Sequence, residues 1–79
     1  MEIRERVYKV LEKMNVNPEK ITDNASFKVD LQFDSIDIYD FIDAVQDEFS
    51  DMGLEIDDKE ILSISSVGDA VSFIEKKVS

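Results

Sequence analysis

The chain has 79 residues, of which 43% are hydrophobic and 35% charged, and its 19 acidic and nine basic side chains give a formal net charge of -10. This length and composition predict a globular protein with one small core, a single domain spanning residues 1–79. The negative charge makes nucleic acid a poor partner. The absence of cysteine and histidine removes thiolate metal sites and the commonest general base, so a classical hydrolase or redox enzyme is not expected.

No apolar run is long enough to cross a bilayer, and residues 1–6 lack the cationic and then apolar pattern of a secretory signal. We therefore expect a cytoplasmic protein that is not transmembrane, and we expect it to be a monomer. The acidic residues are concentrated, because residues 29–58 hold eleven of them and no lysine or arginine. A one-sided field of this kind speeds encounter with a basic partner, although acids also serve solubility alone.

A first amphipathic helix is predicted near the amino terminus by apolar residues at helical spacing: Ile3, Val7, Val10, Leu11 and Met14. The following Asn15-Val16-Asn17-Pro18 ends it, because proline disfavours helix at the preceding residue and has no backbone N–H. A connection of about 20 residues follows, and connections this long are usually functional or fixed by their own side chains. We expect Ile21, Phe27 and Leu31 to fix it.

Residues 27–33 allow two interpretations. Phe27, Val29, Leu31 and Phe33 alternate with polar residues as in a half-buried strand. The only candidate partner is the short segment 53–56, and an isolated pair of short strands is marginal. We therefore interpret residues 27–33 as an ordered loop.

The second helix carries most of the functional information. Asp34 is predicted as its N-cap, with Asp37 in the capping-box position, so that Ser35 is the first helical residue. The core face is formed by Ile38, Phe41, Ile42, Val45 and Phe49. The opposite face collects Asp40, Asp43 and Asp47, with Asp37 and Glu48 at its margins.

Two apolar residues accompany these acids. Ile36 lies on the acidic face and Tyr39 lies between that face and the core. Single exposed hydrophobic residues are common and need no function. Two of them beside a helix amino terminus, within the most acidic stretch, also fit an interaction site.

The last third of the chain predicts a turn, a short helix and a final helix. Gly53 is a candidate for a positive φ, and a short helical turn is expected from Asp57 to Leu62. Ser66 and Asp69 repeat the capping-box spacing, and they open a last helix whose core face holds Val67, Ala70, Val71, Ile74 and Val78. The predicted fold class is all-α: a small bundle of three main helices and one short helix, with a long first loop.

Asp34-Ser35-Ile36-Asp37, at the start of an acidic helix, is similar to the Asp-Ser-Leu signature of acyl carrier proteins. The resemblance to this family extends over nearly the whole chain. Further matches in the same order and spacing are Asp23-Asn24-Ala25-Ser26-Phe27 with Asp30-Leu31, Glu48-Phe49, and Ile64-Ser65-Ser66-Val67. The triplet alone has little weight, whereas the ordered set is specific.

This resemblance implies a non-catalytic carrier. It implies that Ser35 is joined through a phosphodiester to 4'-phosphopantetheine, added from coenzyme A by a phosphopantetheinyl transferase, with acyl groups held as thioesters. A chain without cysteine needs such a cofactor to supply the thiol, and a serine without a nearby histidine needs the modifying enzyme for its activation. The expected pathways are fatty acid, lipid or polyketide-type biosynthesis.

The resemblance also assigns partner and cargo residues. The surface expected to meet basic acyl-loading and acyl-transfer enzymes consists of Asp34, Ile36, Asp37, Tyr39, Asp40, Asp43, Asp47 and Glu48. The acyl chain is expected to fold back among Phe27, Leu31, Ile38, Phe41, Ala44, Val45, Ala70 and Ile74. These apolar residues are also explained by a core that holds no ligand. No metal site is expected.

Several residues depart from the family pattern. Gln32 and Phe33 stand where a glycine and a small or aliphatic residue are usual, Tyr39 stands at a position usually held by valine, and Asp43 replaces a commonly apolar residue. These departures suggest a carrier dedicated to one pathway.

Two other functions are considered. The first is an interaction module with the carrier fold that is never pantetheinylated and acts through its acidic helix alone. The second is a calcium-binding protein, which is weaker because residues 37–48 lack the glycine at loop position six.

Overall fold

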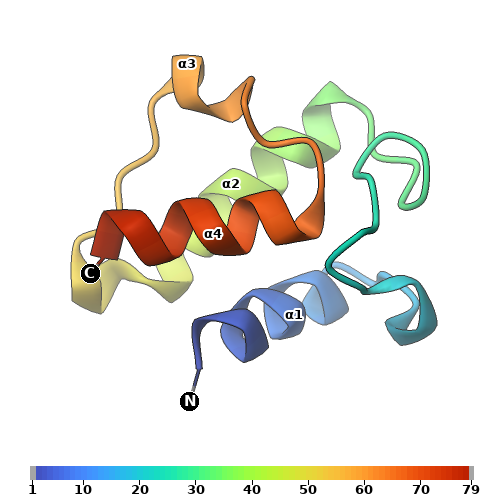
Figure 1. Cartoon of the computed structure of the whole chain (residues 1–79), viewed down its shortest axis with the longest axis horizontal. Coiled ribbons are helices and arrows are strands. Elements are labelled where there is room, and N and C mark those ends of the chain that lie inside the picture. The colour runs from blue at the N-terminus through green and yellow to red at the C-terminus, as the bar shows by residue number, and fades with distance from the viewer. Residues whose placement is uncertain (1, 79) are drawn as a thin grey trace.

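A computed structural model describes residues 2–78 of the chain. In this range four α-helices follow one another: α1 (Ile3–Lys13), α2 (Ser35–Glu48), α3 (Asp58–Ile61) and α4 (Val67–Val78), with 3-10 turns at Pro18–Lys20 and Ser50–Met52 (Figure 1). No strand occurs within residues 2–78. The predicted all-α fold with three main helices, a short one and a long first loop is confirmed.

Helix α1 ends at an asparagine in a left-handed conformation. Asn15 has a φ of 69°. Its N–H bonds to the carbonyl of Glu12 at 3.0 Å, and the N–H of Val16 bonds to the carbonyl of Leu11 at 3.1 Å. This pair of bonds is a Schellman motif, for which asparagine is suited because it tolerates a positive φ. The helix therefore ends before Pro18, which instead begins the first 3-10 turn with Asn17 as its N-cap.

The long connection is an ordered loop, as predicted, and it is attached to the start of α4. Ser26 forms an isolated β-bridge with Ser66. The N–H of Phe27 bonds to the carbonyl of Ser65 at 3.1 Å, and the N–H of Val67 bonds to the carbonyl of Ala25 at 2.9 Å. Of the three residues expected to fix the loop, Ile21 and Phe27 are buried and Leu31 packs partly buried against the core. Of the alternating apolar residues, Phe27, Leu31 and Phe33 pack on the core, whereas Val29 is 75% exposed, so the alternation matches burial only in part.

Helix α2 begins with the predicted capping box. The Asp37 N–H donates to Asp34 Oδ1 at 2.9 Å, and the Asp34 N–H donates to Asp37 Oδ2 at 3.2 Å. Two otherwise unpaired N–H groups at the helix start are satisfied in this way. The predicted core face is confirmed for Phe41, Ile42, Val45 and Phe49, which are buried, while Ile38 is half-buried.

The second half of the chain also follows its local signals. Gly53 has a φ of 71°, which confirms the predicted positive-φ turn. At the start of α4, the Asp69 N–H donates to Ser66 Oγ at 3.1 Å and the Ser66 N–H donates to Asp69 Oδ2 at 3.2 Å. The sequence had not singled out the capping box of α3, in which the Asp57 N–H donates to Glu60 Oε1 at 3.0 Å.

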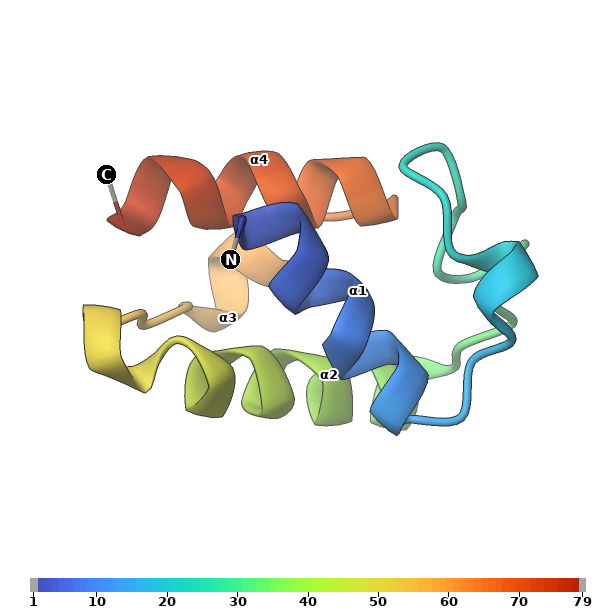
Figure 2. The ribbon, with the colours of Figure 1, turned by 90° about the horizontal axis from the view of Figure 1, so that it is seen from below.

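The three long helices enclose one core. In Figure 2, α2 and α4 run in the same direction on opposite sides, and α1 crosses between them and contacts both. Every buried side chain within residues 2–78 is apolar, and Phe41, Phe49 and Leu11 are the largest that are fully enclosed. Within the same range, no helix combines the length and apolar character that crossing a bilayer requires. The amino-terminal ends of α2 and α4 lie on the same side of the molecule as the long loop (Figures 1 and 2).

Candidate functional site

Ser35 is the first residue of α2 and is exposed. The carboxylates of Asp34 and Asp37 on either side of it are occupied by the capping box, each accepting a backbone N–H from the other residue. The backbone at Ser35 is therefore held by hydrogen bonds on both sides, while its hydroxyl is not used for capping. An exposed hydroxyl at a fixed position suits an acceptor for a modifying enzyme.

A pocket of about 360 Å³ lies beside Ser35. Its walls come from the first turns of α2, the loop at residues 26–28, and α3 with the segment that follows it. The lining consists of Ser26, Phe27, Lys28, Ser35, Ile38, Tyr39, Ile61, Leu62, Ile64 and Ser65. We call this cavity the Ser35 pocket. Its apolar residues could shelter a hydrocarbon chain that begins at Ser35.

The residues predicted to hold an acyl chain are distributed over pocket and core. Phe27 and Ile38 line the Ser35 pocket. The other six do not line it: Phe41, Val45, Ala70 and Ile74 are buried in the core, and Leu31 and Ala44 are partly buried against it. The Phe41 ring nonetheless packs against Phe27 in a tilted arrangement with centroids 4.9 Å apart, and so supports this residue of the pocket wall.

Several lining residues were not identified from the sequence, namely Lys28, Ile61, Leu62 and Ile64. They lie on the loop and on the segment around α3, where apolar periodicity is too short to assign a face. The sequence does contain a signal for the start of α3, namely the spacing of Asp57 and Glu60, which form its capping box. It fixes the helix start and thereby places Ile61 inward, whereas Leu62 is 88% exposed.

The outer face of α2 carries Ile36, Tyr39, Asp40, Asp43 and Asp47, and we call these five residues the acidic face. All five are exposed, with Ile36 at 69% and Tyr39 at 50%. Its three carboxylates take part in none of the ion pairs found within residues 2–78. Since Tyr39 also lines the Ser35 pocket, the acidic face reaches the pocket edge.

Glu48, at the margin of the predicted partner surface, has an intramolecular role. Arg6 Nε bonds to Glu48 Oε2 at 2.9 Å, and Arg6 also donates to the Glu48 carbonyl and to Asp51 Oδ1, the latter at 3.2 Å. The guanidinium lies 4.3 Å from the centroid of the Phe49 ring. Because α2 has no basic residue in its last turn, Arg6 of α1 supplies the positive charge at the negative end of the helix dipole.

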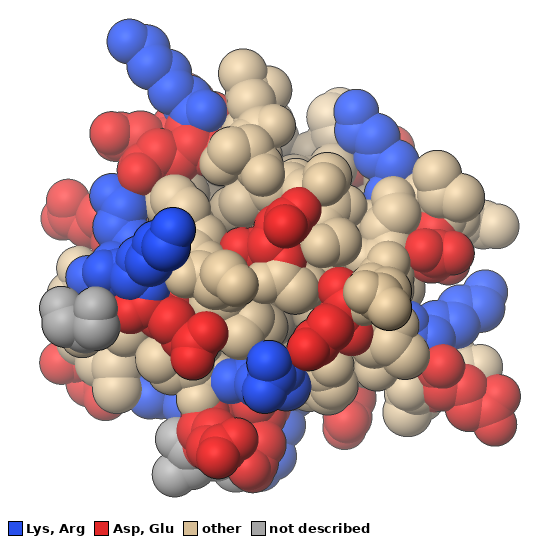
Figure 3. All heavy atoms as spheres, viewed as in Figure 1, with Lys and Arg blue, Asp and Glu red and all other residues tan. Residues whose placement is uncertain are grey.

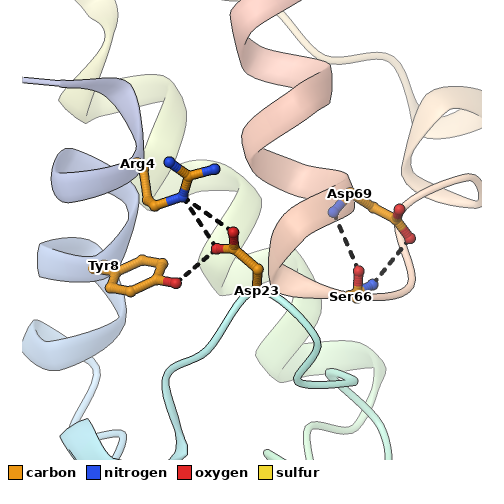
Figure 4. Close-up of polar contacts among 5 residues, drawn as sticks. All are labelled: Arg4, Tyr8, Asp23, Ser66 and Asp69. Atoms are coloured by element: carbon orange, nitrogen blue, oxygen red, sulfur yellow. Dashed lines mark hydrogen bonds and ion pairs between the residues drawn. The ribbon is translucent and has the colours of Figure 1, made fainter.

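Asp23 helps to attach the long loop, which also carries Phe27 and Lys28 of the Ser35 pocket, to α1 and α4. Arg4 Nε lies 3.1 and 3.2 Å from the two Asp23 carboxylate oxygens, and the Tyr8 hydroxyl donates to Asp23 Oδ1 at 2.6 Å (Figure 4). The Asp23 carbonyl accepts the Gly68 N–H at 2.8 Å, and a Cβ at Gly68 would lie 2.9 Å from that oxygen. Asp23 therefore joins α1, the long loop and α4.

Hydrogen bonds lower two pKa values in this region. The Tyr8 hydroxyl, followed by Arg4, holds the pKa of Asp23 below its ordinary value. The Ser65 hydroxyl and N–H, followed by Ser66, hold the pKa of Asp69 below its ordinary value. Both carboxylates stay charged at neutral pH and fix the loop and the start of α4.

The face of the molecule that carries α4 has mixed charge, unlike the acidic face of α2. Figure 3, viewed with α4 toward the reader, shows acidic and basic side chains interspersed over that face. Within residues 2–78, no three acidic side chains converge closely enough to hold a metal ion. Residues 37–48 lie wholly within α2, so they do not form a calcium-binding loop.

The comparison with known proteins agrees with this geometry. The family described as "Phosphopantetheine attachment site" matches residues 5–74. Proteins named "Acyl carrier protein" from Bradyrhizobium sp. (strain ORS 278) and Nitrobacter hamburgensis are each 49% identical to this chain over 76 residues, which is 95% of this chain and 92% of theirs. The chain belongs to the acyl carrier protein family.

Membership establishes the class of function. An acyl carrier protein is a non-catalytic carrier of acyl groups with a phosphopantetheine attachment site, as the resemblance in the sequence implied. The cofactor is phosphopantetheine, and the partners are the enzymes that attach it and those that transfer acyl groups.

Proposed function

We propose that Ser35 is the attachment residue and that the protein carries acyl thioesters on a 4'-phosphopantetheine arm at this position. The observation that supports this most strongly is the exposed Ser35 hydroxyl at the first position of α2, at the edge of an apolar-walled pocket. In the transfer, Ser35 Oγ attacks the phosphorus of coenzyme A that bears the pantetheine. The bond to the adenosine bisphosphate breaks, and the hydroxyl proton passes to a base of the transferase, since the chain has no histidine.

The Ser35 pocket gives the cargo a place beside its point of attachment. Phe27, Ile38, Ile61 and Ile64 supply apolar walls, and Ser35 stands at the rim. Burying hydrocarbon against such walls is favourable by about 25 cal/mol per Å² removed from water. The predicted deeper residues, such as Val45 and Ile74, would join only if a longer chain parted the core that now encloses them.

The acidic face supports docking of basic partner enzymes. Asp40, Asp43 and Asp47 project from α2 with no cation among residues 29–58, and Ile36 and Tyr39 supply apolar contacts beside Ser35. Long-range attraction then brings the enzyme to the side of the molecule that bears the arm. Asp34 and Asp37 would contribute negative charge while keeping their capping role. Glu48 would contribute only the part of its negative charge that Arg6 does not compensate.

Single-domain organisation and a cytoplasmic, monomeric carrier are parts of the same proposal. The family match spans residues 5–74, and the chain covers 92% of the length of the relatives named above. The departures at Tyr39 and Asp43 support a carrier dedicated to one pathway among fatty acid, lipid and polyketide-type biosynthesis.

The test of attachment is a mass measurement. The chain is incubated with coenzyme A and a broad-specificity phosphopantetheinyl transferase, beside Ser35→Ala and the matched control Ser26→Ala, whose hydroxyl also borders the pocket. We expect one arm on the wild type and on Ser26→Ala, and none on Ser35→Ala. An unmodified wild type, under conditions that modify a control carrier, would instead indicate an interaction module that is never pantetheinylated.

A further inference from the structure

Lys28 stands out among the residues around Ser35 because of its charge. Of the described residues that line the Ser35 pocket, it is the only cationic one. It also immediately precedes residues 29–58, which contain eleven acids and no lysine or arginine. A single positive charge is therefore placed at the border of the acidic region, on the wall that shares a pocket with Ser35.

The backbone that carries Lys28 is held on both sides. The N–H of Phe27 bonds to the Ser65 carbonyl at 3.1 Å, and the Phe27 carbonyl accepts the Phe33 N–H at 2.7 Å. The Ser26 N–H donates to Asp30 Oδ2 at 2.7 Å, and the Val29 N–H donates to Ser26 Oγ at 3.2 Å. These bonds form a closed turn, so the side chain of Lys28 starts from a defined point on the pocket wall.

The ammonium group of Lys28 is available. It takes part in none of the ion pairs found within residues 2–78, and the residue is exposed. Asp30, two residues away, is engaged with the Ser26 N–H. Lysine presents a compact charge on a flexible four-carbon stem, which suits a phosphate whose position is set by a covalent link elsewhere.

A phosphodiester on Ser35 would gain from the positive end of the α2 dipole, but it would also lie beside two carboxylates. Asp34 precedes the serine and Asp37 follows two residues later, and both carboxylates are held at the helix start by the capping box. A further negative charge at Ser35 is repelled by both. Within the lining of the Ser35 pocket, only Lys28 offsets that repulsion.

We propose that Lys28 is a positioning residue for the arm, pairing its ammonium with the phosphodiester on Ser35 and so directing the first part of the arm along the pocket rim. This inference rests on the proposed function, because it requires the arm to be on Ser35. The pairing draws the arm toward the walls formed by Phe27 and Ile64 and away from the acidic face.

Lys20 provides a matched control. It lies on the same long loop and is exposed, but it borders a different cavity together with Glu19 and Asp30. Replacing either lysine changes the net charge by the same amount. Only the replacement of Lys28 removes a charge from the Ser35 pocket.

The experiment observes the phosphorus atom itself. Wild type, Lys28→Gln, Lys28→Glu and Lys20→Gln are loaded from coenzyme A, loading is verified by mass, and the phosphorus-31 resonance of the arm is followed as sodium chloride rises. A rise from about 20 mM to about 0.5 M shortens the Debye length from about 20 Å to about 4 Å, which weakens an exposed pair. The readout does not depend on any acyl-transfer activity.

We expect the wild-type resonance to move with salt, and Lys20→Gln to follow it. The Lys28→Gln resonance should start near the high-salt position and lose at least about half of the salt response, while Lys28→Glu should be displaced further in the same direction. Loaded Lys28→Gln with a wild-type resonance and salt response would overturn the pairing alone. Wild-type protein without an arm on Ser35 would overturn this inference and the proposed function together, and the mass measurement separates the two cases.

Discussion

Helices α1 and α2 are both amphipathic and pack against each other, yet they use their charges in opposite ways. Helix α1 carries four basic and two acidic residues, whereas α2 carries five acidic residues and no basic one. The cations Arg4 and Arg6 of α1 reach other segments of the molecule, at Asp23 and at Glu48 with Asp51. Asp40, Asp43 and Asp47 of α2 point outward and pair with nothing in residues 2–78.

The difference separates two roles of charge in one small molecule. Charges on α1 fix the position of the long loop, which supplies one wall of the Ser35 pocket, and the position of the end of α2. Charges on α2 repel one another and are retained without internal compensation, which fits a surface that is neutralised by a partner. Exchanging or removing charges on each helix should therefore have different consequences.

The largest effect is expected from Arg6, the α1 residue that holds the end of α2. Arg6→Met keeps an apolar stem but leaves the Glu48 carbonyl and two carboxylates without their donor, beside the Phe49 ring. We expect a loss of about 2 kcal/mol in the free energy of unfolding, measured by urea denaturation. Arg4→Met, whose side chain is 50% exposed, serves as control and should cost less. Equal losses in the two variants would show that the Arg6 contacts are no stronger than a surface pair.

Charge reversal on α2 should instead change encounter with enzymes. Asp40→Lys or Asp47→Lys places a cation in the acidic face and should slow loading by the phosphopantetheinyl transferase on the order of tenfold at low salt. Stability should change little, because both side chains are exposed. The deficit should shrink as salt rises, since screening removes the attraction that the substitution destroyed.

The loading rates are measured by quenching the transferase reaction at set times and quantifying the loaded carrier by mass spectrometry. Glu5→Lys on α1 changes the net charge equally, on an exposed residue of a different helix, and should have a smaller effect. If Glu5→Lys and Asp40→Lys slow loading alike, net charge and not the acidic face governs encounter.

These contrasts also show which parts of the fold a sequence can predict. Helices α2 and α4 begin where a capping pair, Asp34 with Asp37 or Ser66 with Asp69, meets an apolar period, and both signals are local. The end of α1 was correctly located, although Asn15 in the left-handed conformation ends the helix several residues before Pro18. A positive φ at a non-glycine residue is difficult to predict from the sequence.

The remaining features depend on contacts between distant segments. The bridge from Ser26 to Ser66, the Arg6 contact with Glu48 and the joint lining of the Ser35 pocket by Lys28 and Ile64 have no local signature. The position of Ser35 at the start of α2 and the exposure of the acidic face could be predicted because these residues lie on one helix with a fixed period. The pocket was located only in part, at Phe27 and Ile38, because its other walls come from a loop and a four-residue helix.

A smaller effect, dependent on pH, is expected at the α1 contact with the loop. The pKa of Asp23 is lowered by the Tyr8 hydroxyl and by Arg4, so the folded state binds fewer protons there than the unfolded state. Its contribution to stability is complete above the ordinary pKa of 3.8 and is lost as pH falls through the lower folded value. Asp23→Asn should therefore melt a few degrees lower at pH 7 and approach wild type as pH falls below the ordinary pKa of 3.8.

Thermal melts by circular dichroism at several pH values measure that difference. Asp30→Asn on the same loop is the control. At each pH, the difference in melting temperature between Asp30→Asn and wild type is compared with the difference between Asp23→Asn and wild type. A gap between Asp23→Asn and wild type that stays constant down to pH 2.5 would contradict the role assigned to the Asp23 carboxylate.

The repulsion along α2 predicts a modest gain in stability from cations. Millimolar magnesium, or added sodium chloride, should raise the melting temperature by a few degrees, because weak binding to the folded state and screening both relieve the repulsion. The triple variant Asp40→Asn, Asp43→Asn, Asp47→Asn should start higher and gain less. Glu5→Gln with Glu12→Gln on α1 should gain as much as wild type. Equal gains in the wild type and the triple variant would assign the cation effect to carboxylates elsewhere.

The smallest expected effect concerns which enzymes accept the carrier. Tyr39 and Asp43 lie on the acidic face where the family commonly has apolar residues, and Tyr39 also lines the Ser35 pocket. If the docking site of an enzyme has an apolar pocket at this position, the Asp43 carboxylate loses its hydration there without gaining a partner. Binding to such an enzyme is therefore weakened, while binding to the intended partner is not strengthened. Tyr39→Val with Asp43→Met should therefore raise turnover by general fatty acid enzymes about two- to threefold over wild type, measured on fully loaded carrier at matched concentration. Asp40→Asn is the matched control, since it removes one charge from the same face and should not raise turnover. If the double variant is loaded on Ser35, melts like wild type and still shows unchanged turnover, Tyr39 and Asp43 do not determine the choice of partner.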